Sequence, residues 1–341
     1  MKIIKLFWLV IGLLFFVWCR TAMPPVTEEL STEIPLKYTN AVISVSRIAS
    51  LDSNAICPNI SFDGNLVVFT GDSESYDSDY TNWDIYVVNS NGEGLRKLTE
   101  DAEYIFDQNP CWTPDDQIIY DRDYLKNINI WMSPLDMSSK PIKITSEYPN
   151  AFYPSVSPDG KYIAFVVGAY NLESSYLNSF NSDASTLNEN INEWYYQSEN
   201  TPPQIFIMNT QTGTKSLLTE GIHPSFSPDG KKIAFSRLSS GIMEIWTINI
   251  DGTHLSRLIS TGGNDIEPCW SPSGRNIAFA SGKSGYWKIW AMRINEGTLV
   301  KITEGESSEG HPSWGIGGNL FFHSNAGFIG VYKIWKAKIN F

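Results

Sequence analysis

A hairpin motif that recurs about six times constrains the fold of this chain more than any other feature. Its clearest copy, at residues 223–235, reads HPSFSPDGKKIAF. Pro224 suits the start of a strand, where its missing N–H matters least. Residues 227–230 have the sequence of a type I turn, with Pro at the second place. Because a single hairpin is only marginally stable, the motif predicts a stable fold only through its repetition.

The copies have a regular spacing and a shared order of strands. Their opening prolines are separated by 52, 44, 70, 44 and 44 residues. After each turn, a second strand ends in an aromatic residue, a third contains Ile followed by an aromatic residue, and a fourth usually ends in Leu-Thr or Ile-Thr. Four strands in about 44 residues are typical of a β-propeller blade. The opening prolines are Pro58, Pro110, Pro154, Pro224, Pro268 and Pro312.

The sixth unit has no fourth strand at the end of the sequence, and the missing strand is predicted near the other end. Residues 46–50 read SRIAS and resemble SRLIS at residues 256–260, at the same distance ahead of the next opening proline. An open ring would expose a sheet edge. We therefore predict one all-β domain over residues 41–341. It is a six-bladed propeller of four-stranded antiparallel blades, closed by a strand at about 41–50 that completes the last blade.

The motifs HPSFSPDGKKIAF and EIWTINIDG resemble the TolB-type, WD-like β-propeller repeat, and the resemblance covers about residues 41–341. This repeat is specific for the fold and says little about function. TolB also has an N-terminal α/β domain, for which residues 24–40 are too few. The chain thus resembles the TolB propeller alone. For function, the resemblance implies a place in the cell envelope, where TolB acts with its partner Pal.

The N-terminus predicts export. Two lysines precede an apolar run of 13 residues at positions 6–18, which suits the core of a signal peptide and is short for a membrane span. An uncleaved anchor is the alternative. Cys19 follows the run, as a lipid-modified cysteine does in a bacterial lipoprotein, although Trp stands where that signal has a small residue. We predict a signal at 1–22, a linker at 23–40, and a protein in the periplasm or at the cell surface.

Charge and cysteine content exclude two classes of partner and site. The net charge is −12 and no basic run follows the first few residues, so we expect no nucleic-acid binding. Contact with a membrane is expected only through the signal or a lipid anchor. Cys57, Cys111 and Cys269 have no CxxC spacing and are predicted to be buried free thiols in a monomer.

Loop lengths indicate which face of the propeller is elaborated. In an up-and-down blade, the loop between strands two and three lies on the face of the blade-to-blade connections, opposite the SPDG turns. From the aromatic residue of strand two to the Ile of strand three, blades 2, 4 and 5 take 10 residues, blade 1 takes 16 and blade 3 takes 40. Both large insertions fall on one face, and connections of this length are usually functional or disordered.

The two long loops predict different chemistry. The blade 3 insertion, at about 168–203, combines aromatic residues with Asn and Ser, which suits recognition of a protein or glycan. The alternative is a loop whose aromatic residues pack on their own blade. The acidic blade 1 loop, at 71–84, could hold Ca²⁺ or simply be solvated. The aromatic candidates are Tyr170, Tyr176, Trp194, Tyr195 and Tyr196, and the acidic ones are Asp72, Asp77 and Asp79.

The residue before each opening proline is predicted to ring the mouth of the central channel on the elaborated face. The types vary, and a polar channel lining is the default interpretation. His223, Glu267 and His311 are consecutive around the ring and are suitable ligands for a transition metal. They resemble the channel histidines that hold a metal in oligogalacturonide lyases with propeller folds. The set comprises Cys57, Asn109, Tyr153, His223, Glu267 and His311.

Two functions remain open. The leading hypothesis is an exported, non-catalytic module that binds an envelope protein or glycan on the face carrying the 71–84 and 168–203 loops. It requires no cofactor. The alternative is a metal-dependent polysaccharide lyase with a divalent ion, Ca²⁺ or a transition metal, at the channel mouth. A prolyl-peptidase-like hydrolase is excluded because no G-x-S-x-G elbow occurs.

Overall fold

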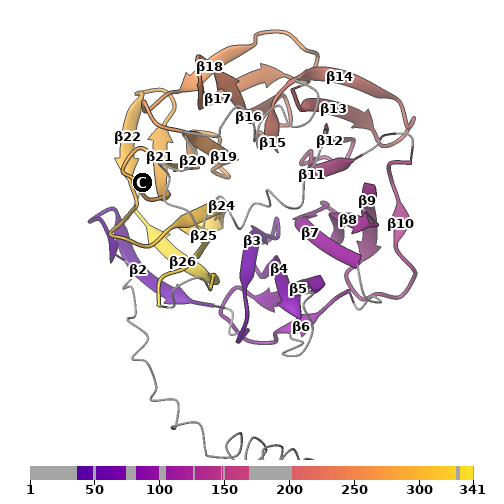
Figure 1. Ribbon diagram of the computed structural model, residues 1–341, viewed down its shortest axis with the longest axis horizontal. Helices are drawn as coiled ribbons and strands as arrows, with labels where there is room; N and C mark the ends of the chain where they lie inside the picture. Colours follow the sequence, from indigo (N-terminus) through magenta and orange to yellow (C-terminus); the bar gives the residue numbers. More distant parts are fainter. Residues whose placement is uncertain are drawn as a thin grey trace, which may run out of the picture. The chain divides into compact units, whose positions relative to one another are not determined.

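The structure, a computed structural model, forms a ring of six four-stranded antiparallel sheets (Figure 1). All described residues lie in one compact unit, Ile34–Phe341. The all-β, six-bladed prediction is confirmed. None of the helices in the described part is both long and apolar enough to cross a membrane. The described residues are 37–48, 51–73, 82–99, 105–125, 127–146, 148, 150–168, 202–327 and 331–340.

Each blade runs from an innermost strand outward. Blade 1 contains β3 (Ala55–Ile60), β4 (Leu66–Ser73), β5 (Asn82–Asn89) and β6 (Arg96–Lys97). Blade 2 contains β7 (Ile105–Trp112), β8 (Gln117–Tyr124), β9 (Asn127–Pro134) and β10 (Ile142–Lys143). Blade 3 contains β11 (Ala151–Val156), β12 (Tyr162–Val167), β13 (Gln204–Asn209) and β14 (Lys215–Glu220).

The remaining blades repeat this order. Blade 4 contains β15 (Ile222–Phe226), β16 (Lys232–Ser239), β17 (Ile242–Asn249) and β18 (Ser256–Ile259). Blade 5 contains β19 (Asp265–Trp270), β20 (Asn276–Ser281), β21 (Lys288–Arg293) and β22 (Thr298–Lys301). Blade 6 contains β24 (Glu309–Gly315), β25 (Asn319–Ser324), β26 (Lys333–Ile339) and, from the N-terminal side, β2 (Val42–Arg47).

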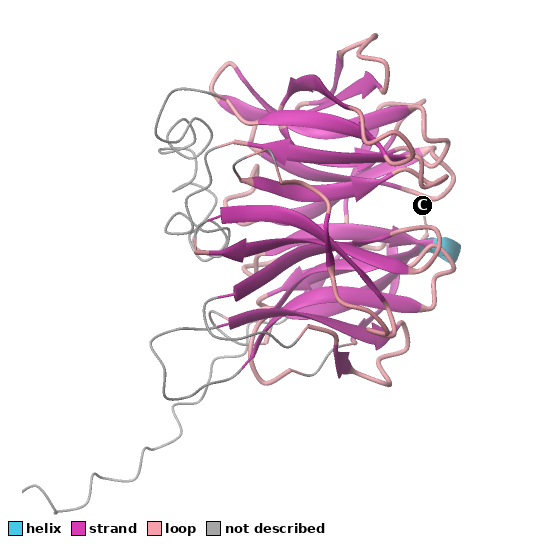
Figure 2. Ribbon diagram, turned by 90° about the vertical axis from the view of Figure 1, so that its right-hand side faces the viewer, coloured by secondary structure: helices cyan, strands magenta, loops and turns pink. Residues whose placement is uncertain are grey.

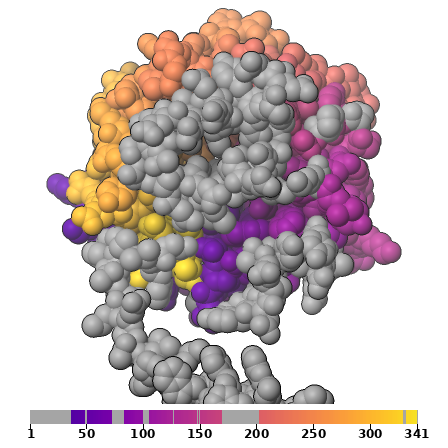
Figure 3. Space-filling model, in the orientation of Figure 1, coloured from indigo at the N-terminus to yellow at the C-terminus, as the bar shows by residue number. Residues whose placement is uncertain are grey.

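The N-terminal strand closes the ring, as predicted. β2 pairs antiparallel with β26, and Arg47 lies opposite Trp335. In the space-filling view, the indigo N-terminal end of the described chain adjoins the golden and yellow C-terminal blades (Figure 3). A further two-residue strand, β1 (Lys37–Tyr38), pairs with β23 (Thr303–Glu304). Part of the segment predicted as a linker therefore extends the closure to the edge of blade 5.

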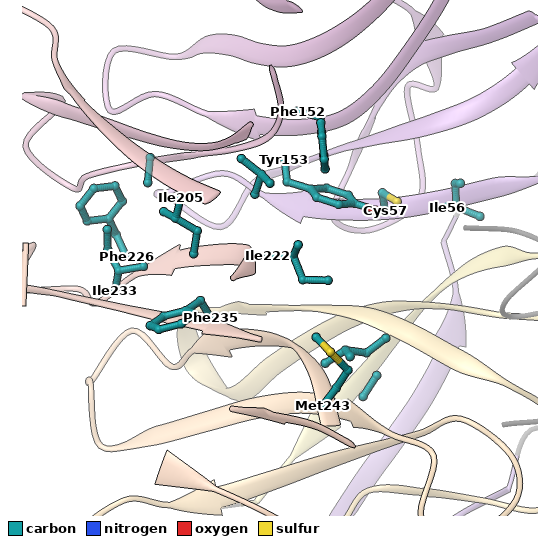
Figure 4. Close-up of a cluster of buried hydrophobic side chains, with 14 of the residues drawn as sticks. Ile56, Cys57, Phe152, Tyr153, Ile205, Ile222, Phe226, Ile233, Phe235 and Met243 are labelled. Atoms are coloured by element: carbon teal, nitrogen blue, oxygen red, sulfur yellow. The ribbon is translucent and has the colours of Figure 1, made fainter. Parts of the chain in front are cut away.

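A pair of aromatic residues stabilises the middle of every blade. The aromatic residue at the fourth place of each second strand is fully buried and lies directly opposite an aromatic residue of the third strand, an arrangement that stabilises antiparallel sheets. Phe235 also belongs to the largest buried cluster, in which side chains of several blades meet (Figure 4). The pairs are Phe69–Tyr86, Tyr120–Trp131, Phe165–Phe206, Phe235–Trp246, Phe279–Trp290 and Phe322–Trp335.

The two faces of the ring differ in their connections. The SPDG-type turns join first to second strands on one face, which we call the turn face. Its blade 6 turn contains the 3-10 helix η3 (Ile316–Gly318), visible at one side in Figure 2. Strands β4 and β12 end on the opposite face, which we call the loop face, because second strands run away from the turns.

Ring closure gives a first prediction. A chain that begins at residue 51 should melt about 10 °C lower than one that begins at residue 37. Loss of β2 exposes β26 and removes the buried Val42 and Ile48, which together contribute roughly 3–6 kcal/mol. Thermal unfolding followed by circular dichroism measures the difference. Equal melting temperatures would show that β2 is not needed to close the ring.

Candidate functional site

The residue before each opening proline has a left-handed backbone. A non-glycine residue in this region costs roughly 1–3 kcal/mol, and a residue before proline normally prefers an extended backbone. The strand register shifts at this position in all six blades. Because the geometry recurs with different side chains, it belongs to the blade architecture. The φ values are 52° (Cys57), 50° (Asn109), 51° (Tyr153), 52° (His223), 58° (Glu267) and 51° (His311).

The bulges direct these side chains into the axis of the ring. Five of the six residues line one cavity of about 100 Å³, together with the prolines that follow them. They lie within the channel rather than at an open surface, since His223 and Glu267 are only 6% and 4% exposed. The rings of Tyr153 and His223 are in contact, with centroids 4.5 Å apart. The lining residues of the set are Asn109, Tyr153, His223, Glu267 and His311.

The bulges also direct backbone N–H groups toward the preceding blade. In three cases the acceptor is the residue that follows the buried aromatic of the preceding blade's second strand, a role that sequence reasoning missed. In blade 6, the N–H of His311 is accepted instead by Glu267 of blade 5. These hydrogen bonds join neighbouring blades around the channel. The three pairs are Tyr153 N to Asp121 Oδ1 (3.2 Å), Glu267 N to Ser236 Oγ (3.0 Å) and Cys57 N to His323 Nδ1 (3.3 Å).

Asp121 is a buried carboxyl group that titrates near neutral pH. It follows Tyr120 in β8 and is 3% exposed. Burial raises the pKa of Asp121 to about 7, although hydrogen bonds from Asn109 and from the backbone of Tyr153 oppose this shift. The channel wall therefore contains a carboxyl group that loses its proton in the physiological range.

Glu267 and His311 form an ion pair beside a thiol. Glu267 Oε1 lies 3.6 Å from His311 Nδ1. Burial favours the neutral imidazole, but contacts with Cys57 and with the carboxylate of Glu267 outweigh it and raise the pKa of His311. Burial likewise raises the pKa of the Cys57 thiol. These shifts favour an imidazolium at His311 and a protonated thiol at Cys57 at neutral pH.

The other two channel histidines are neutral. Burial, and secondarily the charge of His311, lowers the pKa of His223 well below its usual value, and the same causes act on His323. His223 Nδ1 lies 3.3 Å from Ser236 Oγ. Within the described ranges, no three His, Cys, Asp or Glu side chains are arranged to hold a metal ion.

The other sequence candidates fall into two groups. Both carboxylate oxygens of Asp72 accept hydrogen bonds from Asn54, at 2.8 and 3.1 Å, so Asp72 holds the start of blade 1 in place. Cys57 and Cys111 are buried free thiols as predicted, while Cys269 is half-buried. The remaining candidates lie outside the described residues. They are Cys19, Asp77, Asp79, Tyr170, Tyr176, Trp194, Tyr195 and Tyr196.

Comparison with known families agrees with this geometry. The TolB beta propeller domain family matches residues 185–334, which include the whole of blades 4 and 5. Over these residues, the chain is similar to the TolB-type β-propeller repeat. An uncharacterized protein of Agrobacterium fabrum is 32% identical to it over 65 residues. That match covers 18% of this chain and 22% of the relative, about a fifth of the relative's length.

Solved structures share the fold of this six-bladed propeller at low sequence identity. TolB from Acinetobacter baumannii is 18% identical, with a TM-score of 0.56 over 81% of this chain and 64% of that one. An oligogalacturonate lyase in complex with manganese is 16% identical, with a TM-score of 0.55 over 91% of this chain and 98% of that one. The same propeller architecture therefore occurs in a protein named TolB and in a lyase, so the fold alone does not decide between their functions.

The buried carboxyl group of Asp121 predicts a pH dependence of the stability of the propeller. Folding raises the pKa of Asp121 from 3.8 to about 7, so protonation of this carboxyl group stabilises the folded state. This stabilisation is complete below pH 3.8 and is lost as the pH rises through 7. The wild type should therefore lose up to about 4 kcal/mol relative to Asp121→Asn between pH 4 and pH 8. Urea unfolding of both proteins measures this, and a constant difference would contradict it.

The ion pair predicts a second titration. Glu267→Gln removes the carboxylate that favours the charged imidazole, so the pKa of His311 should fall. In the wild type, the stability that comes from this raised pKa is present below pH 6.5 and lost as pH rises through the folded value. NMR titration of the imidazole resonances measures the change. An unchanged pKa of His311 would mean that Glu267 does not stabilise the protonated imidazole of His311.

Proposed function

We propose that this protein is an exported, non-catalytic, monomeric module that binds an envelope protein or glycan on its loop face. The observation that carries the proposal is the convergence of Asn109, Tyr153, Glu267 and His311 in one channel on a rigid ring. Amide, phenol, carboxylate and imidazolium groups held by backbone bulges are suited to recognising a polar group without induced fit. The proposed binding face is the one that carries the 71–84 and 168–203 loops.

The protonation states in the channel favour binding over catalysis. A general base at neutral pH must be unprotonated and within reach of substrate. His311 is held as a cation by Glu267, and His223 is only 6% exposed. The Cys57 thiol is 1% exposed and its pKa is raised, so it does not supply a thiolate nucleophile.

Export and an envelope location rest on two arguments. The N-terminal sequence has the charge and apolar run of a signal peptide, with Cys19 available for a lipid. The repeats are of the TolB type, and the protein named TolB from Acinetobacter baumannii shares the fold. Contact with the membrane is then confined to the signal or the lipid anchor.

The binding hypothesis is tested by capture of a partner from an envelope extract. Residues 172–200 can be replaced by a short glycine linker, because Val167 and Gln204 are paired in the sheet and flank the insertion closely. Capture should be lost from this deletion variant, which should retain the wild-type melting temperature. Capture should be reduced at least fivefold in His311→Gln, which should remain folded at the assay temperature. Leu217→Ser, on the outer strand of blade 3, serves as the control. Unchanged capture by the deletion variant would exclude the insertion as the recognition element.

A metal-dependent lyase is the second candidate function, favoured by the fold shared with an oligogalacturonate lyase in complex with manganese. It would use His223, Glu267 and His311, or in the case of Ca²⁺ the loop that contains Asp72. Elemental analysis of the purified protein, repeated for His223→Ala/His311→Ala, separates the two functions. A stoichiometric metal that the double variant loses would favour the lyase. Absence of metal, with capture intact, would favour the binding module.

A further inference from the structure

The channel leads to a second cavity at the turn face, of about 290 Å³. The two cavities share lining residues such as Ser155 and Ser225, so they adjoin each other within the ring. The walls of the second cavity are formed by the last residues of the innermost strands, among them Phe226, Trp270 and Trp314. We call this cavity the aromatic pocket.

The aromatic pocket offers no charge and few unused polar groups. None of its lining residues is charged. Two of its indoles are held by hydrogen bonds from their ring nitrogens. Trp112 Nε1 donates to Asn59 O at 3.0 Å, and Trp270 Nε1 donates to Ser225 O at 3.2 Å. These bonds run between neighbouring blades and leave the ring faces to form the walls.

Two serine hydroxyls of the aromatic pocket are engaged within the fold. Ser155 Oγ accepts the N–H of Phe226 at 3.3 Å, and Ser313 Oγ accepts the N–H of Ile60 at 3.0 Å. These serines hold the main chain of neighbouring blades together around the pocket. Because none of its lining residues is charged, the pocket suits an apolar group without charge.

One side of the pocket has an exposed apolar rim. Four of the six turns carry Pro at the second place, but blades 1 and 6, which are neighbours, carry Phe62 and Ile316 there. These side chains are 49% and 51% exposed. The two turns are in contact, since a Cβ added to Gly64 would lie 2.7 Å from Ile316 Cγ1. The apolar surface thus continues out of the cavity over this side.

We propose that the aromatic pocket binds one uncharged aromatic side chain of a polypeptide partner, whose main chain crosses the rim of Phe62 and Ile316. The volume of about 290 Å³ equals roughly ten water molecules, which suits a single large side chain. Aromatic walls favour an aromatic guest by offset or edge contacts. A free aromatic molecule would leave the apolar rim uncovered, whereas a peptide covers it. This site lies at the other end of the channel from the proposed function and does not depend on it.

The experiment compares two probes by isothermal titration calorimetry on the full chain. Indole represents the group alone, and the N-acetylated, amidated peptide Gly-Gly-Trp-Gly-Gly represents it on a main chain. We expect the peptide to bind at least threefold more tightly than indole. Galactose and the corresponding pentaglycine peptide should not bind. Equal affinities of indole and the tryptophan peptide, or comparable binding of either control probe, would overturn the proposal.

Four variants, two of them controls, locate the site. Phe62→Ser should abolish the advantage of the peptide over indole, whereas Leu217→Ser, which alters a side chain that is 53% exposed on blade 3, should not. Ser225→Phe fills the pocket and should weaken both probes at least tenfold. His311→Ala, in the other cavity, should leave both unchanged. Because Phe62 is at the surface, its variant remains informative if Ser225→Phe does not fold. Binding that survives Phe62→Ser and Ser225→Phe unaltered, or that is lost with His311→Ala, would contradict this site.

Discussion

The left-handed bulge before each opening proline is the constraint on which the channel depends. It recurs at φ values of 50–58° in all six innermost strands. The bulge turns one side chain toward the axis, and in several blades it gives the freed N–H to an acceptor on the preceding blade, as Tyr153 does to Asp121. The backbone strain is therefore offset by interblade hydrogen bonds and by the packed ring around them. The backbone geometry at this position is the same in every blade, whereas the residue type varies. The position can therefore present a different functional group in each blade.

Ring closure makes these strained positions possible. The aromatic pair in each blade, such as Phe235 with Trp246, stabilises a single sheet, but the acceptors for the bulges come from neighbouring sheets. The contact between β2 and β26 completes the circle, so that blade 6 presents His323 to Cys57 of blade 1. Because the blades support each other in this way, the channel exists only when all six are in place.

The electrostatics of the channel follow from burial and proximity together. Burial, and secondarily the charge of His311, lowers the pKa of His223 and of His323, and burial raises the pKa of Asp121 to about 7. His311 is more exposed than the other two histidines, and its contacts with Cys57 and with the Glu267 carboxylate raise its pKa. The same scaffold therefore yields a charged, polar end toward the loop face and an uncharged, aromatic end toward the turn face. An axial channel with two chemically different ends can serve two unlike ligands.

The sequence by itself determined the number of blades, the order of their strands, the closing strand and the set of residues before the prolines, because all of these follow from a repeat of local signals. It did not indicate Asp121, Ser236 or His323 as acceptors, since each serves a residue about 30 or more positions away in the next blade, or across the closure. The charge of His311 and the aromatic pocket that Trp270 lines were also decided only by the tertiary structure. Desolvation and enclosed volume arise when distant segments are packed together, and no local pattern of residues encodes them.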